Sequence, residues 1–169
     1  MVESGKPAII WCIFVDSIQR LAKALEKQGV ATRCIYGEVS LEEHQTILND
    51  FRARKIQVLL TNPHTLAESV SLHSVCHDAI YFEYSYNLVH LLQSKDRIHR
   101  LGLPDDQYTQ YYYQQVFYDT EAGKWSLDAA VYDRLREKER IMLEAIENRK
   151  LEILPTSNED LDIIFSKLL

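Results

Sequence analysis

Apolar and polar positions along this chain switch between two periods, and the switching predicts strands and helices in turn. A continuous apolar run at 8–14 is too short for a helix and rich in β-branched and aromatic residues, so it predicts a strand buried on both faces. Apolar residues three and four apart then predict a helix that is capped by Asp16 or Ser17 and ends near Gln28, before Gly29.

The same order repeats through the middle of the chain. The segment Ser40 to Glu43 forms a capping box that opens one helix, and Asn87 can cap another. Strands separated by helices predict βαβ units with right-handed crossovers and a parallel sheet covered on both faces. The further strands are predicted at 32–36, 56–60 and 78–83.

The C-terminal third changes character. A dense run of β-forming residues at 108–118 predicts a fifth strand near the sheet edge, and 119–126 is a polar turn. A long charged helix follows at 127–150, and Thr156 or Asn158 can start a short amphipathic tail helix. The tyrosines of the fifth strand could stack on bases, but packing with hydroxyls at the rim is the use we favour.

These elements predict one α/β domain at 1–150 and a helical tail at 151–169 that packs on it. A chain of 169 residues with 46% hydrophobic and 26% charged residues suits a soluble domain with a sizeable core. No apolar run approaches the length of a membrane span, so we expect no membrane partner and a cytoplasmic location. The formal charge of −6 disfavours general nucleic-acid affinity but leaves a local basic groove open.

Cysteine usage indicates a reducing compartment. Cys12, Cys34 and Cys76 are odd in number and form no C-x-x-C pair, so we predict neither a disulfide framework nor a zinc knuckle. His73, Cys76 and His77 could offer metal ligands, yet a structural zinc needs four. We favour packing for this group and predict no metal site.

The strongest chemical signal lies in one amide and two guanidiniums. Gln93, Arg97 and Arg100 are spaced by four and three residues, which places them on one face of a predicted helix. Two permanently charged guanidinium groups that point the same way are well placed to bind a polyphosphate. A solvated, charged helix face would produce the same spacing, and spacing alone leaves both interpretations open.

The ordered blocks resemble the C-terminal RecA-like lobe of a superfamily-two helicase and are most similar to Swi/Snf-type ATPases. Residues 93–102 resemble motif VI of that family, Q-x-x-x-R-x-x-R-x-G. The resemblance implies a RecA-like parallel sheet of five to six strands sandwiched by helices, with a C-terminal helical extension. It also implies that Arg97 and Arg100 act as catalytic arginine fingers on ATP, beside Gln93 and Gly102 in the nucleotide site.

The segment 62–72 occupies the place of the family's motif V, although it contains no glycine. The resemblance implies a nucleotide contact for Glu68. It implies nucleic-acid contacts for Asn62, Ser69 and Ser71, and also for His44, which stands where the family often has arginine. A loop held by its own hydrogen bonds remains the alternative for 62–72.

Two elements of a complete ATP site are missing from the sequence. It has neither a G-x-x-x-x-G-K-[ST] loop nor an acidic pair after a strand. We therefore expect ATP and Mg²⁺ to be held largely by an N-terminal RecA-like lobe, and the isolated chain to be inactive. The resemblance implies double-stranded DNA as the partner, with nucleoid association if the protein is bacterial.

Two alternatives stay open. One is a strand-separating helicase lobe of another superfamily-two branch. The other is a non-enzymatic interaction module that binds a protein through the helix at 127–150.

Overall fold

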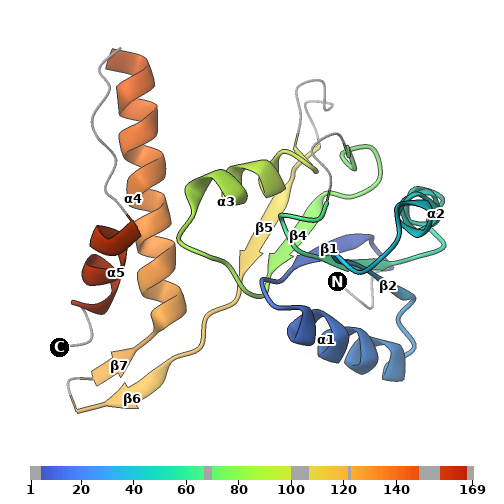
Figure 1. Ribbon diagram of the computed structural model, residues 1–169, viewed down its shortest axis with the longest axis horizontal. Helices are drawn as coiled ribbons and strands as arrows, with labels where there is room; N and C mark the ends of the chain where they lie inside the picture. The colour runs from blue at the N-terminus through green and yellow to red at the C-terminus, as the bar shows by residue number, and fades with distance from the viewer. Residues whose placement is uncertain (1–4, 67–69, 100–106, 122, 149–156, 167–169) are drawn as a thin grey trace. The chain divides into compact units, whose positions relative to one another are not determined.

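A five-stranded parallel sheet forms the centre of the first of two compact units. The computed structural model describes residues 5–66, 70–99, 107–121, 123–148 and 157–166. The strand order is β2-β3-β1-β4-β5, and every neighbouring pair is parallel (Figure 1). The predicted parallel sheet is therefore confirmed. The strands are β1 Ala8–Trp11, β2 Thr32–Ile35, β3 Val58–Thr61, β4 Asp78–Tyr81 and β5 Gln110–Tyr113.

Three helices connect these strands: α1 Val15–Lys27, α2 Leu41–Arg52 and α3 Leu88–Lys95. From β1 the chain moves outward in one direction to β2, and from β4 it moves in the opposite direction to β5. Right-handed crossovers in opposite directions place their helices on opposite faces. Accordingly, α1 lies on one face of the sheet and α3 on the other (Figure 1).

The core of this unit lies on both faces of the central strands. All four residues of β1 and of β3 are buried, as the continuous apolar runs predict. On one face, Ile10 and Leu60 pack with Ile18 and Ala22 of α1. Ile18 is fully buried, and burying a side chain of this size contributes about 1.5–3 kcal/mol to the stability of the fold.

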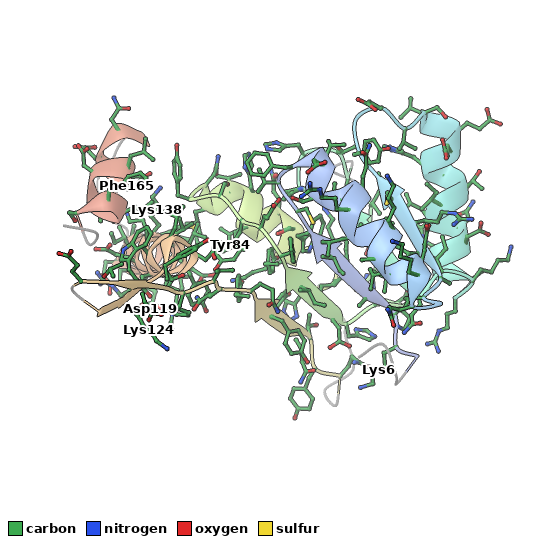
Figure 2. All side chains as sticks on the ribbon, turned by 90° about the horizontal axis from the view of Figure 1, so that it is seen from below. Lys6, Tyr84, Asp119, Lys124, Lys138 and Phe165 are labelled. Atoms are coloured by element: carbon green, nitrogen blue, oxygen red, sulfur yellow. The ribbon has the colours of Figure 1, made fainter. Side chains whose placement is uncertain are left out.

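The second unit comprises residues 85–89 and 115–169. It contains α4 Leu127–Asn148 and α5 Ser157–Phe165, which confirm the long helix and the tail helix. The predicted polar turn at 119–126 is wrong, because an antiparallel hairpin of β6 Tyr118–Thr120 and β7 Gly123–Trp125 forms there. Gly123, the first residue of β7, has a φ of 120°, a backbone conformation that residues with a Cβ rarely adopt. Asp119 and Lys124 face each other across this hairpin (Figure 2).

A buried ion cluster joins α4 to α5. Asp160 accepts from Arg134 Nε at 2.9 Å and also from Lys138, and all three side chains are 10% exposed or less. The long helix therefore has a buried charged stripe besides the solvated face that its charge pattern predicts. Arg140 and Glu144 form an exposed pair on that solvated face, at 2.6 Å.

Two of the predicted helix N-caps agree with the structure, and those predicted for α1 do not. Ser40 accepts from the amide of Glu43 at 3.2 Å, and Asn87 accepts from that of Val89 at 3.0 Å, so both predicted caps are confirmed. The caps proposed for α1 are wrong. The N-cap is Phe14, which makes no side-chain hydrogen bond there. The predicted domain boundary at 150/151 lies outside the described residues and stays a prediction.

The remaining global expectations concern cysteines and membranes. All three cysteines are free thiols, with Cys12 and Cys76 buried. Burial raises the pKa of the Cys76 thiol to about 12, which keeps it protonated at neutral pH and agrees with a packing role. Among the described helices, none combines the length and the apolar character that crossing a bilayer requires.

Candidate functional site at the carboxyl edge of the sheet

The carboxyl ends of β1 and β4 form the topological switch point of the sheet. The two strands are adjacent and parallel, but β1 leads to α1 on one face and β4 leads towards α3 on the other. In open α/β sheets the connecting loops separate at such a point and leave a crevice where ligands bind. A ligand-binding site is therefore expected at this edge of the sheet.

Glu83 occupies this switch point. Its Oε2 accepts from the backbone amides of Ile13 and Phe14, both at 3.0 Å, and its Oε1 accepts from Ser17 Oγ at 2.5 Å. The carboxylate thus replaces the missing side-chain cap of α1 and lies at the positive end of its dipole. As a result, amides that could otherwise hold a phosphate at this helix end are already engaged by the protein.

In the sequence, Glu83 is only the last residue of the strand predicted at 78–83. A signal for its role does exist. Asp16 and Ser17 are the local candidates for the cap of α1. Glu83 follows the buried strand β4, and neighbouring parallel strands end at the same edge of a sheet, so Glu83 can also reach the start of α1. The capping of α1 by Glu83 depends on β1 and β4 being neighbours, which the strand pattern in the sequence does not specify.

The predicted arginine helix is shorter than expected. α3 ends at Lys95, so Arg97 lies in the turns that follow it, and its predicted place on the helix is wrong. The amides of Arg97 and Ile98 donate three residues back, to Ser94 and Lys95, at 3.3 and 3.2 Å. Bonds of this type tighten a final turn and rotate the side chains away from the α-helical positions.

Arg97 is tied to the loop that precedes β4. Its Nη1 donates to the carbonyl of Val70 at 3.4 Å, and its own carbonyl accepts from the amide of Leu72 at 2.7 Å. The Arg97 side chain is buried, as are Val70 and Leu72. The structure therefore brings the motif VI arginine and the end of the motif V segment into direct contact.

A second contact joins the same loop to α3. The rings of His64 and His90 meet edge to face, with centroids 4.1 Å apart. Burial, and then the neighbouring His64, lower the pKa of His90, so its imidazole is neutral at pH 7. The loop is thus connected to α3 through His64, and to the turns after α3 through Val70 and Leu72.

Two residues predicted to contact nucleic acid take part in the loop's own hydrogen bonds. Asn62 is buried, and its Oδ1 accepts from the amide of Thr65 at 2.8 Å. Ser71 Oγ lies 2.5 Å from Nδ1 of His73. These contacts support the alternative of an internally bonded loop, and the nucleic-acid roles of both residues stay predictions.

The other predicted residues are placed less closely together. Gln93 is half-buried on α3, one turn before the arginine. His44 is on α2, and its Nε2 is buried without a hydrogen-bond partner among the described residues. Four predicted site residues lie outside the described part of the chain: Glu68, Ser69, Arg100 and Gly102.

Tyr111 and Tyr113 of β5 pack as the favoured interpretation predicts, whereas Tyr112 is exposed. The rings of Tyr81 and Tyr113 stack with centroids 4.8 Å apart, and Tyr84 meets Tyr113 edge to face. Tyr111 donates its hydroxyl to the carbonyl of Lys95 at 3.3 Å. These rings therefore fasten β5 to β4 and to the end of α3, next to Arg97.

Comparison with known proteins identifies the family of this fold. A family model described as the helicase conserved C-terminal domain matches residues 1–102. The ATP-dependent RNA helicase RhlB of Xanthomonas axonopodis pv. citri is 25% identical over 93 residues. That match covers 53% of this chain but only 15% of RhlB.

Two solved structures share the fold. The C-terminal part of the Fun30 ATPase domain superposes on 99% of this chain and 49% of its own, with a TM-score of 0.67 and 15% identity. The C-terminal domain of the DEAD-box protein Dbp5 matches 64% of this chain and 59% of its own, with a TM-score of 0.53 and 17% identity. The predicted RecA-like fold of a helicase C-terminal lobe is confirmed.

Proposed function

We propose that this chain, which belongs to the helicase conserved C-terminal domain family, is the second motor lobe of an ATP-dependent DNA translocase or helicase. In this proposal ATP lies between two RecA-like lobes. Arg97 and Arg100 approach its phosphates from this lobe, and Gln93, Glu68 and Gly102 complete this side of the nucleotide site. Their guanidiniums stabilise the charge that develops during phosphoryl transfer.

The observation that carries the proposal is the contact between Arg97 and the loop at 70–72. An arginine whose backbone and side chain are both bonded to a loop is held in a defined orientation. Preorganised charge of this kind is what electrostatic catalysis requires. The same contact gives the proposed nucleotide side of the lobe a direct connection to the proposed nucleic-acid side.

The described residues fit a partial nucleotide site. Glu83 already fills the amide cradle at the start of α1, so this lobe offers arginines rather than a phosphate loop. Bound ATP would supply the phosphoanhydride whose hydrolysis opens and closes the two lobes. We assign the holding of Mg²⁺ and of the phosphates to an N-terminal lobe, and we expect this chain alone to lack ATPase activity.

We further propose double-stranded DNA as the track, contacted through Asn62, Ser69, Ser71 and His44. The superposition on the Fun30 ATPase domain over nearly the whole chain supports the lobe fold that this proposal requires. We place the activity in the cytoplasm, associated with the nucleoid if the protein is bacterial. RhlB is named an RNA helicase, so a strand-separating lobe that acts on RNA is the second candidate.

One experiment tests the function and separates the two candidates. In a protein that carries both lobes, ATP turnover is measured without nucleic acid, with duplex DNA and with single-stranded RNA. We expect stimulation by duplex DNA and a loss of about a thousandfold in Arg100→Ala. Stimulation by RNA alone would favour the second candidate, and undiminished turnover in Arg100→Ala would contradict the arginine-finger role.

A further inference from the structure

One cavity of the first unit lies at the edge of the sheet opposite to the candidate site. It has a volume of about 560 Å³ and is lined by residues at or just before the first residues of β1, β4 and β5, together with Arg54 from the turn after α2. Parallel strands all begin at one edge and end at the other, so this cavity lies at the opposite edge of the sheet from Glu83. Its volume is in the range of small-molecule sites.

Cationic groups lie at one end of this cavity. Lys6 precedes β1, and Arg54 follows α2 and leads towards β3. Both side chains are exposed, and neither forms an ion pair with another residue in the described ranges. A guanidinium and an ammonium in the lining of one cavity suit a phosphate group.

The backbone of Arg54 adds a second observation. Its φ is 57°, in the left-handed region, directly after Ala53, the C-cap of α2. The amides of Arg54 and Lys55 donate back to Phe51 and Asp50, at 3.0 and 2.9 Å, as in a helix-terminating turn. Glycine is the residue that usually occupies this position, because a Cβ is unfavourable there. An arginine at a backbone position that favours glycine, with its side chain at a cavity, suggests a use for that guanidinium.

The opposite end of the cavity suits a planar, hydrogen-bonding group. Tyr108 is 77% exposed, and Gln107 and Gln110 lie near it in sequence at the start of β5. The Oε1 of Gln110 accepts from the hydroxyl of Tyr112 at 2.7 Å, which fixes the amide. Exposed aromatic rings stack on nucleobases, and side-chain amides pair with their edges.

Polar groups also lie between the two ends. Asp78, at the start of β4, is buried and lines the cavity, and Nδ1 of His77 is buried without a partner among the described residues. A carboxylate accepts hydrogen bonds from hydroxyls but repels phosphate. Asp78 therefore suits the sugar of a ligand and disfavours an anion at the centre of the cavity.

We propose that this cavity binds a mononucleotide, with its phosphate at Lys6 and Arg54, its sugar at Asp78 and its base on Tyr108. The order of these groups follows the sheet, where β3, β1, β4 and β5 are successive neighbours. Three strand spacings of roughly 4.8 Å span about 14 Å, a length that accommodates phosphate, sugar and base in that order.

Calorimetric titration of the full chain with AMP, adenosine and inorganic phosphate tests the proposal. We expect saturable AMP binding at millimolar concentration or below, and binding at least about tenfold weaker for adenosine and for phosphate. Absence of saturable AMP binding would overturn the proposal. Equal affinity for phosphate and AMP would also overturn it, because it would indicate an anion site only.

Substitutions locate the site. Arg54→Gly is expected to weaken AMP binding about tenfold while preserving or raising the thermal stability, since glycine suits φ of 57°. Arg52→Ala removes a neighbouring exposed arginine that does not line the cavity and should leave the affinity unchanged. Tyr108→Ala should weaken AMP and adenosine but not phosphate. Unchanged AMP affinity in Arg54→Gly, or a loss that Arg97→Ala alone produces, would place the nucleotide elsewhere.

Discussion

The carbonyl of Arg97 accepts from the amide of Leu72 at 2.7 Å, while the guanidinium of Arg97 donates back to the carbonyl of Val70. This reciprocal contact connects two segments that are 25 residues or more apart in sequence. Only the second of the two bonds depends on the arginine side chain. Substitution of Arg97 therefore removes one of the two bonds and leaves the backbone bond in place.

We expect Arg97→Ala, in a protein with both lobes, to lower the rate of ATP turnover about a thousandfold while ATP affinity changes less. The reason is that a finger stabilises the transition state more than the bound substrate. Steady-state turnover and equilibrium ATP binding measure the two effects. Arg97→Lys keeps the charge but loses the planar guanidinium with its paired N–H donors, so its turnover should exceed that of Arg97→Ala only slightly.

The exposed Arg20 forms a surface pair with Asp16 and provides the matched control. Arg20→Ala should leave turnover unchanged. If Arg97→Ala instead weakens ATP binding and turnover equally, or only lowers the melting temperature, Arg97 is structural rather than catalytic.

Glu83→Gln is expected to destabilise the first unit by about 2 kcal/mol. The change removes the charge that accepts from two amides at the start of α1 and turns one acceptor into a donor. Denaturant unfolding followed by circular dichroism gives the free energy of unfolding. Glu38→Gln changes an exposed acid on a loop and should have an effect near zero. Equal stability of the two variants would show that the capping contacts contribute little.

Asp160→Ala is expected to release α5 from α4. Removing the shared acid leaves Arg134 and Lys138 buried without it, a change that costs about 3–5 kcal/mol. Amide hydrogen exchange across 157–166 should increase strongly, whereas exchange in β1 and β3 should not.

The exposed pair of Arg140 and Glu144 supplies the control for this prediction. Glu144→Ala should change stability by about 0.5 kcal/mol or less. Unaltered protection of α5 in Asp160→Ala would mean that apolar contacts, such as those of the buried Ile164, suffice to hold it.

Stability should fall as the pH drops below about 6.5. Burial lowers the pKa values of His77 and His90 in the folded chain, so the unfolded chain binds protons more readily. The stabilising contribution is complete above the unfolded pKa and is lost as the pH falls towards the folded values, with a slope of at most about 1.4 kcal/mol per pH unit for each histidine.

Thermal unfolding between pH 5 and 8 measures this slope, and the double variant His77→Gln, His90→Gln should flatten it. His99 is exposed, and His99→Gln should leave the slope as it is. A slope that persists in the double variant would assign the pH dependence to other groups.

Local patterns in the sequence predict much of this fold for identifiable reasons. Continuous apolar runs predict β1 and β3 because both faces of these strands are buried. Ser40 and Asn87 cap their helices through bonds two or three residues away, so the neighbouring sequence contains the whole interaction.

The errors concern features that depend on partners distant in sequence or on fine backbone geometry. The cap of α1 comes from Glu83, 69 residues beyond Phe14, and no local pattern contains it. The spacing of Gln93 and Arg97 is helical, yet the last turn tightens before Arg97 is reached. The hairpin of β6 and β7 is short and exposed, so it lacks the apolar alternation that reveals buried strands.

If the proposed motor function holds, the carboxylate of Glu83 at the start of α1 affects how nucleotide is released. Backbone amides at a helix end cannot withdraw from a bound phosphate, because their positions are set by the helix itself. Arginine side chains can withdraw when two lobes separate. A lobe whose helix end is already occupied by its own carboxylate would therefore release the hydrolysed nucleotide once its arginine side chains move away. No backbone amides at that helix end would keep the nucleotide bound and delay the next cycle.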